Sequence, residues 1–170
     1  PESSIVDILR LVHANWIARL APYSPSDCAA TCLFAIQSEE KITIARIGDG
    51  MIAVDGESGM SSFILKDDKQ DSFSNYTDCL ESKFKPDNWE TKTIESAKCK
   101  AIVLCTDGIS DDLLPEKRMS FFQELYTVYR HMDSKKRNKD LRKWLHAWPV
   151  PGHSDDKTIA CLHKREVTSE

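Results

Sequence analysis

Residues 101–108 read Ala-Ile-Val-Leu-Cys-Thr-Asp-Gly, an apolar run that ends in an acidic turn. The same arrangement occurs where the apolar run Ile42–Ile47 leads into Gly48-Asp49-Gly50. A third copy is reversed, because Asp155-Asp156-Lys157-Thr158 comes directly before the apolar run Ile159–Leu162. Short apolar runs bounded by turn residues are typical of buried β-strands.

These acidic turns are expected to meet at one edge of an antiparallel sheet. In such a sheet the end of one strand lies beside the start of its neighbour. Asp49 and Asp107 follow strands, whereas Asp155 and Asp156 precede one. An Asp-Gly pair on its own is more typical of an ordinary turn, so only the combination is specific. Clustered carboxylates repel one another unless cations lie between them, and hard oxygen ligands suit Mg²⁺ or Mn²⁺. The pattern therefore predicts a metal-dependent hydrolytic site.

Length and composition indicate one ordinary globular domain over residues 1–170. The chain is long enough to bury a core, and its 41% hydrophobic and 29% charged content is typical of folded proteins. Its net charge of −4 gives no electrostatic basis for nucleic acid as the main partner. The sequence has no apolar run of about 18 residues, so we expect no membrane partner either.

The cysteines indicate a reducing environment. None of them forms a CxxC pair, and most lie inside apolar runs, which favours small buried side chains over zinc ligands or disulfides. No signal-peptide pattern is present, and together these features predict a cytoplasmic protein. The six cysteines are Cys28, Cys32, Cys79, Cys99, Cys105 and Cys161.

Hydrophobic periodicity predicts helices and strands along the chain. A helix is expected from Ile5 to Leu20, capped by Ser3 or Ser4, with two later helices beginning near Pro115 and near Asp133 or Ser134. Residues Lys66–Asn88 have no sustained period and are expected to form a mobile surface segment. The expected strands are Cys28–Ile36, Lys41–Ile47, Met51–Asp55, Thr91–Ser96, Lys100–Cys105 and Thr158–Leu162.

Taken in order, the motifs resemble those of the metal-dependent type 2C protein serine/threonine phosphatases, particularly a bacterial branch. Ala45–Gly50 is similar to the glycine-aspartate turn of that family, and Leu104–Gly108 resembles its Thr-Asp-Gly motif. Asp155–Thr158 is similar to its Asp-Asn-x-Thr motif. Asp27–Leu33 resembles a family strand that ends in Thr and small residues, and Ser74–Thr77 an Asn-x-Thr signature of the bacterial branch.

The resemblance implies an α+β fold, a four-layer α-β-β-α sandwich of two antiparallel sheets flanked by helices. It also implies hydrolysis of phosphoserine and phosphothreonine in proteins, by a water that bridges two Mn²⁺ or Mg²⁺ ions, with a third ion in some members. The implied partners are a phosphoprotein substrate and a cognate Ser/Thr kinase. The alternative is a catalytically inactive pseudophosphatase that acts as a regulatory phosphoprotein-binding or kinase-binding module.

The resemblance also assigns residues. It implies that Asp107 and Asp155 are catalytic metal ligands, and that Asp49 helps Asp107 to hold a third ion. The candidates of lower rank are Asp111, expected in the second shell, Asp156, where the family often has Asn, and Gly108 beside Asp107.

The resemblance further predicts that these residues correspond to the C-terminal two-thirds of the family domain. The family has an N-terminal Asp-Gly motif, whose Asp bridges both metals, and in many members an upstream Arg that holds phosphate. Neither is found ahead of the helix expected at Ile5. We therefore expect the domain to lack its N-terminal strands and to be inactive without a further fragment. We also expect it to expose an unpaired apolar sheet edge.

Overall fold

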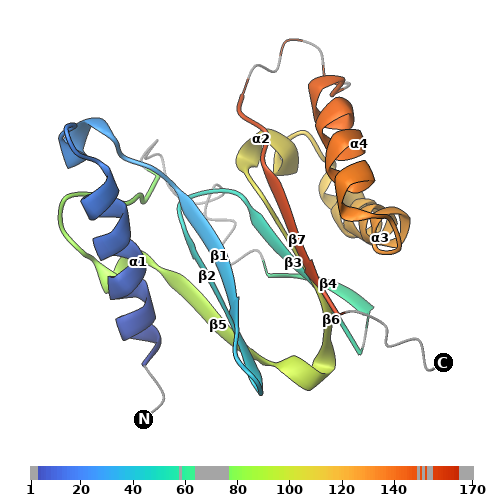
Figure 1. Ribbon diagram of the computed structural model, residues 1–170, viewed down its shortest axis with the longest axis horizontal. Helices are drawn as coiled ribbons and strands as arrows, with labels where there is room; N and C mark the ends of the chain where they lie inside the picture. The colour runs from blue at the N-terminus through green and yellow to red at the C-terminus, as the bar shows by residue number, and fades with distance from the viewer. Residues whose placement is uncertain are drawn as a thin grey trace. The chain divides into compact units, whose positions relative to one another are not determined.

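The computed structural model of the chain describes residues 4–57, 59–63, 77–148, 150, 152 and 155–164 (Figure 1). The chain forms two compact units, each with its own antiparallel sheet. The first unit consists of Pro1–Asp49 and Leu65–Ser96, and the second of Gly50–Ile64 and Ala97–Glu170. Within the described residues, no helix combines the length and the apolar character that a membrane span requires.

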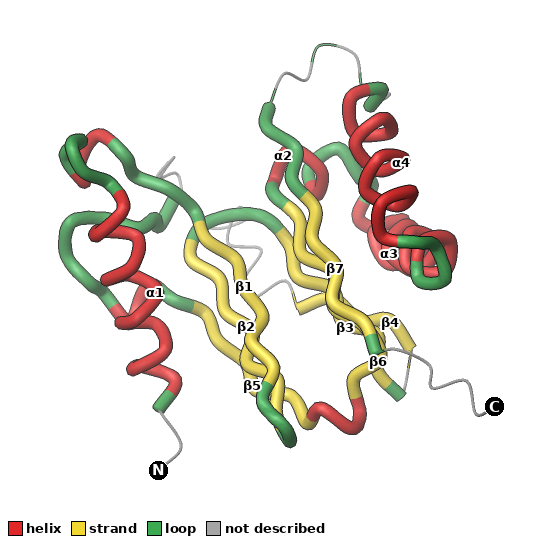
Figure 2. The backbone as a smooth tube through the Cα atoms, viewed as in Figure 1, coloured by secondary structure: helices red, strands yellow, loops and turns green. Residues whose placement is uncertain are grey.

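The first unit contains a three-stranded sheet in the order β1-β2-β5. Its strands are β1 (Cys32–Gln37), β2 (Lys41–Ile47) and β5 (Glu90–Glu95), and β2 has the bounds that the sequence predicts. Figure 2 shows helix α1 (Ile5–Arg19) beside this sheet. The central strand is the most buried of the three, because among the described residues it alone has a neighbour on each side.

Helix α1 begins with the cap that the sequence predicts. The Ser4 hydroxyl accepts a hydrogen bond from the Asp7 backbone N–H at 3.3 Å, and the Asp7 carboxylate accepts one from the Ser4 N–H at 3.1 Å. This reciprocal pair satisfies two donors that the first helical turn would otherwise leave unpaired. Leu9, only 2% exposed, joins the helix to a core that also contains Ala45, Ile47, Leu80 and Trp89.

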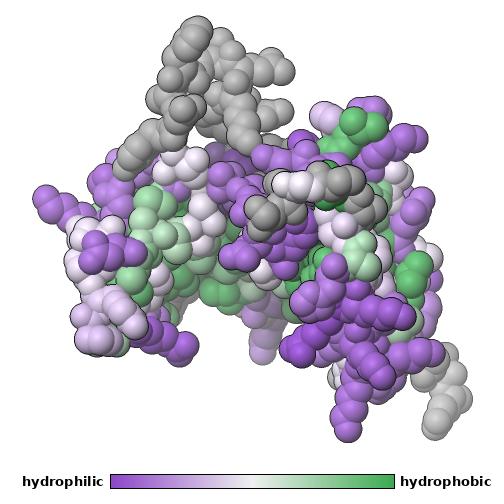
Figure 3. Space-filling view, turned by 90° about the horizontal axis from the view of Figure 1, so that it is seen from above, coloured by the Kyte–Doolittle hydropathy of each residue, from purple (hydrophilic) through white to green (hydrophobic). Residues whose placement is uncertain are grey.

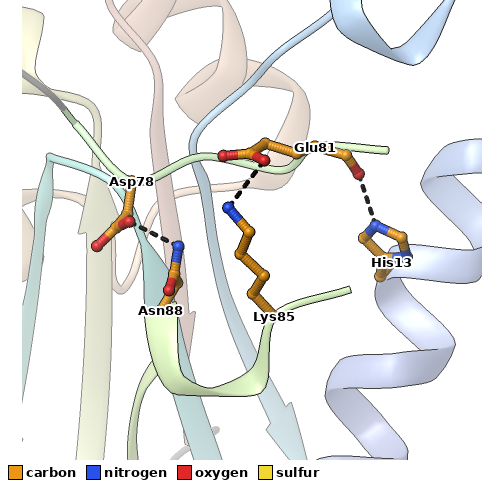
Figure 4. A network of polar contacts seen from close by, with 5 residues as sticks. All are labelled: His13, Asp78, Glu81, Lys85 and Asn88. Atoms are coloured by element: carbon orange, nitrogen blue, oxygen red, sulfur yellow. Dashed lines mark hydrogen bonds and ion pairs between the residues drawn. The ribbon is translucent and has the colours of Figure 1, made fainter. Parts of the chain in front are cut away.

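Residues 77–88 are held against α1, contrary to the mobile surface segment predicted for Lys66–Asn88. Leu80 is buried, and the Glu81 carbonyl accepts a hydrogen bond from His13 Nε2 at 2.8 Å. Figure 4 shows this bond together with those from Lys85 Nζ to the Glu81 carboxylate, at 3.0 Å, and from Asn88 to Asp78, at 2.6 Å. The sequence does not reveal this order, because the segment has no hydrophobic periodicity and is held by a few long-range contacts. Residues 66–76 lie outside the described residues.

The second unit contains a four-stranded sheet in the order β4-β3-β6-β7. Its strands are β3 (Met51–Gly56), β4 (Gly59–Phe63), β6 (Cys99–Cys105) and β7 (Ile159–His163). All neighbouring pairs are antiparallel. Strand β6 is central and almost wholly buried, whereas β7 pairs with β6 and, among the described residues, has no neighbour on its other side.

The described part of the second unit contains three α-helices: α2 (Asp107–Ser110), α3 (Arg118–Tyr129) and α4 (Ser134–His146). As predicted, Asp133 caps α4, since its carboxylate accepts the N–H groups of two first-turn residues. Phe122, fully buried on α3, packs against the sheet in a core with Met51, Ala53, Val103, Cys105 and Ile109. The short 3₁₀ helices of the described chain are Pro25–Asp27, Pro86–Asn88, Ser96–Lys98 and Pro115–Lys117.

One prediction about a strand is wrong. The strand predicted at Cys28–Ile36 begins only at Cys32, because the chain leaves a 3₁₀ turn at Asp27 and Ala30 makes a single isolated bridge. Among the apolar strands, Ile36 on β1 is 43% exposed and Leu162 on β7 is 38% exposed. Both lie on edge strands, and an apolar run alone does not distinguish an edge strand from a central one.

Candidate functional site

Strands β6 and β7 bring two of the acidic motifs together. Cys105, the last residue of β6, pairs with Ile159, the first residue of β7. The Thr106-Asp107-Gly108 turn leaving β6 therefore lies beside the Asp155–Thr158 segment entering β7, as expected for antiparallel neighbours.

The side chain of Thr106 fastens these two segments. Its hydroxyl donates to the Asp156 carbonyl at 3.0 Å and accepts from the Thr158 N–H at 3.0 Å. The Thr106 N–H donates to the Thr158 carbonyl at 3.1 Å. No role for Thr106 or Thr158 was predicted from the sequence. Their positions within the Thr-Asp-Gly and Asp-Asp-Lys-Thr motifs were the signal that could have identified them.

Gly108 allows the close approach. A Cβ atom built there would lie 2.5 Å from the Asp156 carbonyl oxygen and 3.4 Å from the Asp155 Cβ. A contact of 2.5 Å to a backbone atom cannot be relieved by a side-chain rotation. Position 108 therefore requires glycine, because the segment at Asp155 and Asp156 occupies the volume that a side chain at position 108 would fill.

The carboxylates of Asp107 and Asp155 are each oriented by a bond to the following backbone N–H. Asp107 Oδ1 accepts from Gly108 at 2.8 Å, and Asp155 Oδ1 accepts from Asp156 at 2.9 Å. Asp107 is half-buried and Asp155 exposed. Two carboxylates on adjoining segments supply the hard oxygen donors that Mg²⁺ and Mn²⁺ prefer, and in that respect the residues fit such an ion. Within the described part of the chain, no group of three or more His, Cys, Asp or Glu gathers to hold a metal.

The other candidates of the second unit lie close to this turn. Asp111 caps the end of α2, and its N–H donates to the Asp107 carbonyl at 2.9 Å, so the two residues are one helical turn apart. Asp156 is exposed and contributes its backbone carbonyl to the Thr106 bond. Asp112, which the sequence did not single out, accepts a 2.6 Å hydrogen bond from Trp148 Nε1. That bond ties the end of α2 to the chain beyond α4.

Asp49 lies at the end of β2 in the first unit, and its role as a ligand stays a prediction. The preceding Gly48 has a φ of +90°, and a Cβ there would lie 2.3 Å from the Thr31 methyl carbon. Arg46 of the same motif is buried and paired with Glu90, its register partner on β5, at 2.9 Å. The motif therefore has a structural part in the first unit. The predicted Asn-x-Thr signature lies largely outside the described residues.

Cys105, although adjacent to the acidic turn, is not suited to act as a nucleophile. Burial raises the pKa of its thiol to about 12, with a smaller opposing contribution from its contact with the Met51 backbone. A thiol with that pKa remains protonated and unreactive at neutral pH. This agrees with a site whose chemistry depends on carboxylates.

Comparison with known proteins identifies the family. The sequence profile of protein phosphatase 2C matches residues 2–146. The chain belongs to the protein phosphatase 2C family. The matched residues include Asp49, Asp107 and Asp111, whereas Asp155 lies beyond them. No curated protein matches the chain.

Solved structures show the same fold. The catalytic domain of the serine/threonine phosphatase PstP, in complex with two manganese ions, is 13% identical with a TM-score of 0.52, over 91% of this chain and 78% of that domain. A sex-determining protein of C. elegans is 14% identical with a TM-score of 0.60, over 95% and 47%. A mutant of a bacterial serine phosphatase is 17% identical with a TM-score of 0.51, over 80% and 53%.

These likenesses confirm the predicted α+β class, with two antiparallel sheets flanked by helices, as a protein phosphatase 2C fold. They are all below 25% identity and therefore bear on the fold alone. The chain spans about half the length of the bacterial serine phosphatases that it matches.

Proposed function

We propose that this chain takes part in the metal-dependent hydrolysis of phosphoserine and phosphothreonine in proteins. Membership of the protein phosphatase 2C family supports the reaction class. The observation that carries the proposal is the bonding of the Thr106–Gly108 turn to the Asp155–Thr158 segment, which sets Asp107 and Asp155 on adjoining segments.

Asp107 and Asp155 are the residues that would hold the cations in this proposal. Bound Mn²⁺ or Mg²⁺ would neutralise charge on the phosphoryl group and lower the pKa of water. We assign two ions to the site. Thr106 and Gly108 position the two carboxylates, and Asp111 and Asp156 play supporting parts.

The proposal includes partners and a location. The substrate is a phosphoprotein, and a Ser/Thr kinase that phosphorylates it is the cognate partner. All six cysteines are free thiols, which supports a reducing, cytoplasmic location.

The test is turnover of a phosphothreonine peptide by the protein with Mn²⁺, followed by chelation. We expect activity that chelation abolishes. Asp107→Asn should remove it, whereas the control Asp87→Asn, at an exposed carboxylate outside the site, should not. Turnover without metal would contradict the mechanism. Mn²⁺-dependent peptide binding without turnover would support the pseudophosphatase alternative.

We also propose that a further strand pairs with β7, as the family resemblance implies. Among the described residues β7 is bonded on one side only, and Leu162 on it is 38% exposed. An unpaired edge with apolar side chains promotes association. Residues 1–170 should therefore self-associate through this edge as their concentration rises, and a peptide that pairs with β7 should suppress the association. A chain that stays monodisperse as its concentration rises would contradict this.

A further inference from the structure

Helix α4 carries six of its seven basic residues on one face, with Arg137 outside it. Counted from Lys135, the residues at i+4, i+7, i+8 and i+11 are all basic, and positions with this spacing share a face of a helix. Lys136 flanks them, and all six side chains are exposed. The members of this basic face are Lys135, Lys136, Lys139, Arg142, Lys143 and His146.

The lysines and the arginine of the basic face have no carboxylate partner within the described part of the chain. The one acidic residue inside α4, Asp140, accepts a 2.8 Å hydrogen bond from the hydroxyl of Tyr129 on α3. Asp133 uses its carboxylate to cap the helix backbone. The chain as a whole has a net charge of −4, so this concentration of positive charge is local.

Helix stability does not account for the basic face. Like charges four residues apart repel, as do Lys135 with Lys139 and Lys139 with Lys143. Lys135 and Lys136 also lie in the first turn, where the helix dipole disfavours cations. Only Lys143 and His146, in the last turn, are placed favourably with respect to the dipole. An anionic ligand would offset these costs.

The opposite face of α4 fixes the helix beside the acidic turn. Trp144 stacks on Phe121 of α3 with ring centroids 5.7 Å apart. Trp148, just after the helix, donates its 2.6 Å hydrogen bond to Asp112, which follows α2. Asp155 comes nine residues after His146 in the sequence. A ligand on the basic face would therefore be held in the same unit as Asp107 and Asp155.

We propose that the basic face of α4 docks an acidic segment of the phosphoprotein substrate. The inference rests on the proposed function for the identity of the partner, and charge complementarity supplies the contact. A membrane is disfavoured, because interfacial helices insert an apolar face and that of α4 packs on α3. A nucleic acid is disfavoured, because the net negative charge of the chain would repel an extended polyanion. Figure 3 shows broad hydrophilic surface interrupted by apolar patches on the side that it displays.

The test measures binding without turnover. The probe is an unphosphorylated, fluorescently labelled peptide of aspartates and glutamates, and its anisotropy is followed as the 170-residue chain is added. We expect binding that weakens steeply with salt. The triple variant Lys135→Glu, Lys139→Glu, Lys143→Glu should weaken binding about tenfold, since each exposed ion pair contributes little but three are reversed. The matched control reverses the same charge at exposed lysines elsewhere: Lys83→Glu, Lys100→Glu, Lys117→Glu.

Each outcome tests the docking proposal independently of the proposed phosphatase activity. Binding that the α4 variant loses and the control keeps supports docking, whether or not the protein hydrolyses phosphopeptides. If the α4 variant and the control lost peptide binding equally, the loss would be explained by the net charge of the chain, and the docking proposal would be overturned. Tighter binding of a single-stranded oligonucleotide or of phosphatidylserine vesicles than of the peptide would also overturn it. Turnover that persists without peptide binding would refute docking and leave the proposed reaction intact.

Discussion

Gly108→Ala should damage the site and the stability of the second unit together. The added Cβ would lie 2.5 Å from the Asp156 carbonyl oxygen, and ordinary contact begins at 3.4 Å, so the two segments must separate by about 0.9 Å. Both hydrogen bonds of the Thr106 hydroxyl, now 3.0 Å long, would then exceed bonding distance.

The expected loss of stability is about 3–5 kcal/mol, since overpacking costs about 1–3 kcal/mol and each of the two lost hydrogen bonds about 1 kcal/mol. With a urea dependence of about 2 kcal/mol/M, the unfolding midpoint should fall by about 1.5–2.5 M. Because Asp155 moves with Asp156, Mn²⁺ affinity should fall about 10- to 100-fold. Urea unfolding and calorimetric Mn²⁺ titration measure the two effects.

Gly56→Ala provides the matched control. There the added Cβ meets only the Lys98 carbonyl oxygen at 3.4 Å, an ordinary contact, in the same unit. Its stability should stay within about 1 kcal/mol of the parent, with unchanged Mn²⁺ affinity. If Gly108→Ala were as stable as this control and bound Mn²⁺ equally well, the reasoning from the close approach would be refuted.

Three further predictions concern the acidic motifs and the thiol. Asp107→Asn and Asp155→Asn should each reduce Mn²⁺ affinity strongly while stability without metal holds or rises, because carboxylate repulsion is relieved; unfolding with intact metal binding would make them structural turn residues. Gly48→Ala should cost about 3 kcal/mol or more by urea unfolding, since φ is +90° and Thr31 occupies the Cβ position; a loss below that of Gly56→Ala would refute it. The thiol of Cys105, with its pKa raised to about 12, should alkylate far more slowly than an exposed thiol between neutrality and pH 9, because its thiolate fraction is much smaller. Because an unfolded thiol ionises near pH 9 and the folded one only near 12, its contribution to stability should be present below pH 9 and be lost as pH rises towards 12; fast alkylation at pH 8 would contradict the burial.

The local sequence alone determined most elements and the pairing of the two site motifs. The apolar runs at Lys41–Ile47 and Lys100–Cys105, and the caps Ser4 and Asp133, were predictable because strand pattern and capping depend on nearby residues. The approach of Asp107 to Asp155 followed from antiparallel pairing of strands that end and begin in acidic turns.

Tertiary structure alone decided what depends on distant partners. Leu80 is buried because its segment packs against α1 and strand β2, and no local pattern encodes such contacts. Two similar apolar runs became a buried central strand in β6 and, among the described residues, an exposed edge strand in β7, since a strand's neighbours are set by the order of the whole sheet. Thr106 likewise joins the two segments by a hydrogen bond to a partner about fifty residues away in sequence, which the motif alone could not specify.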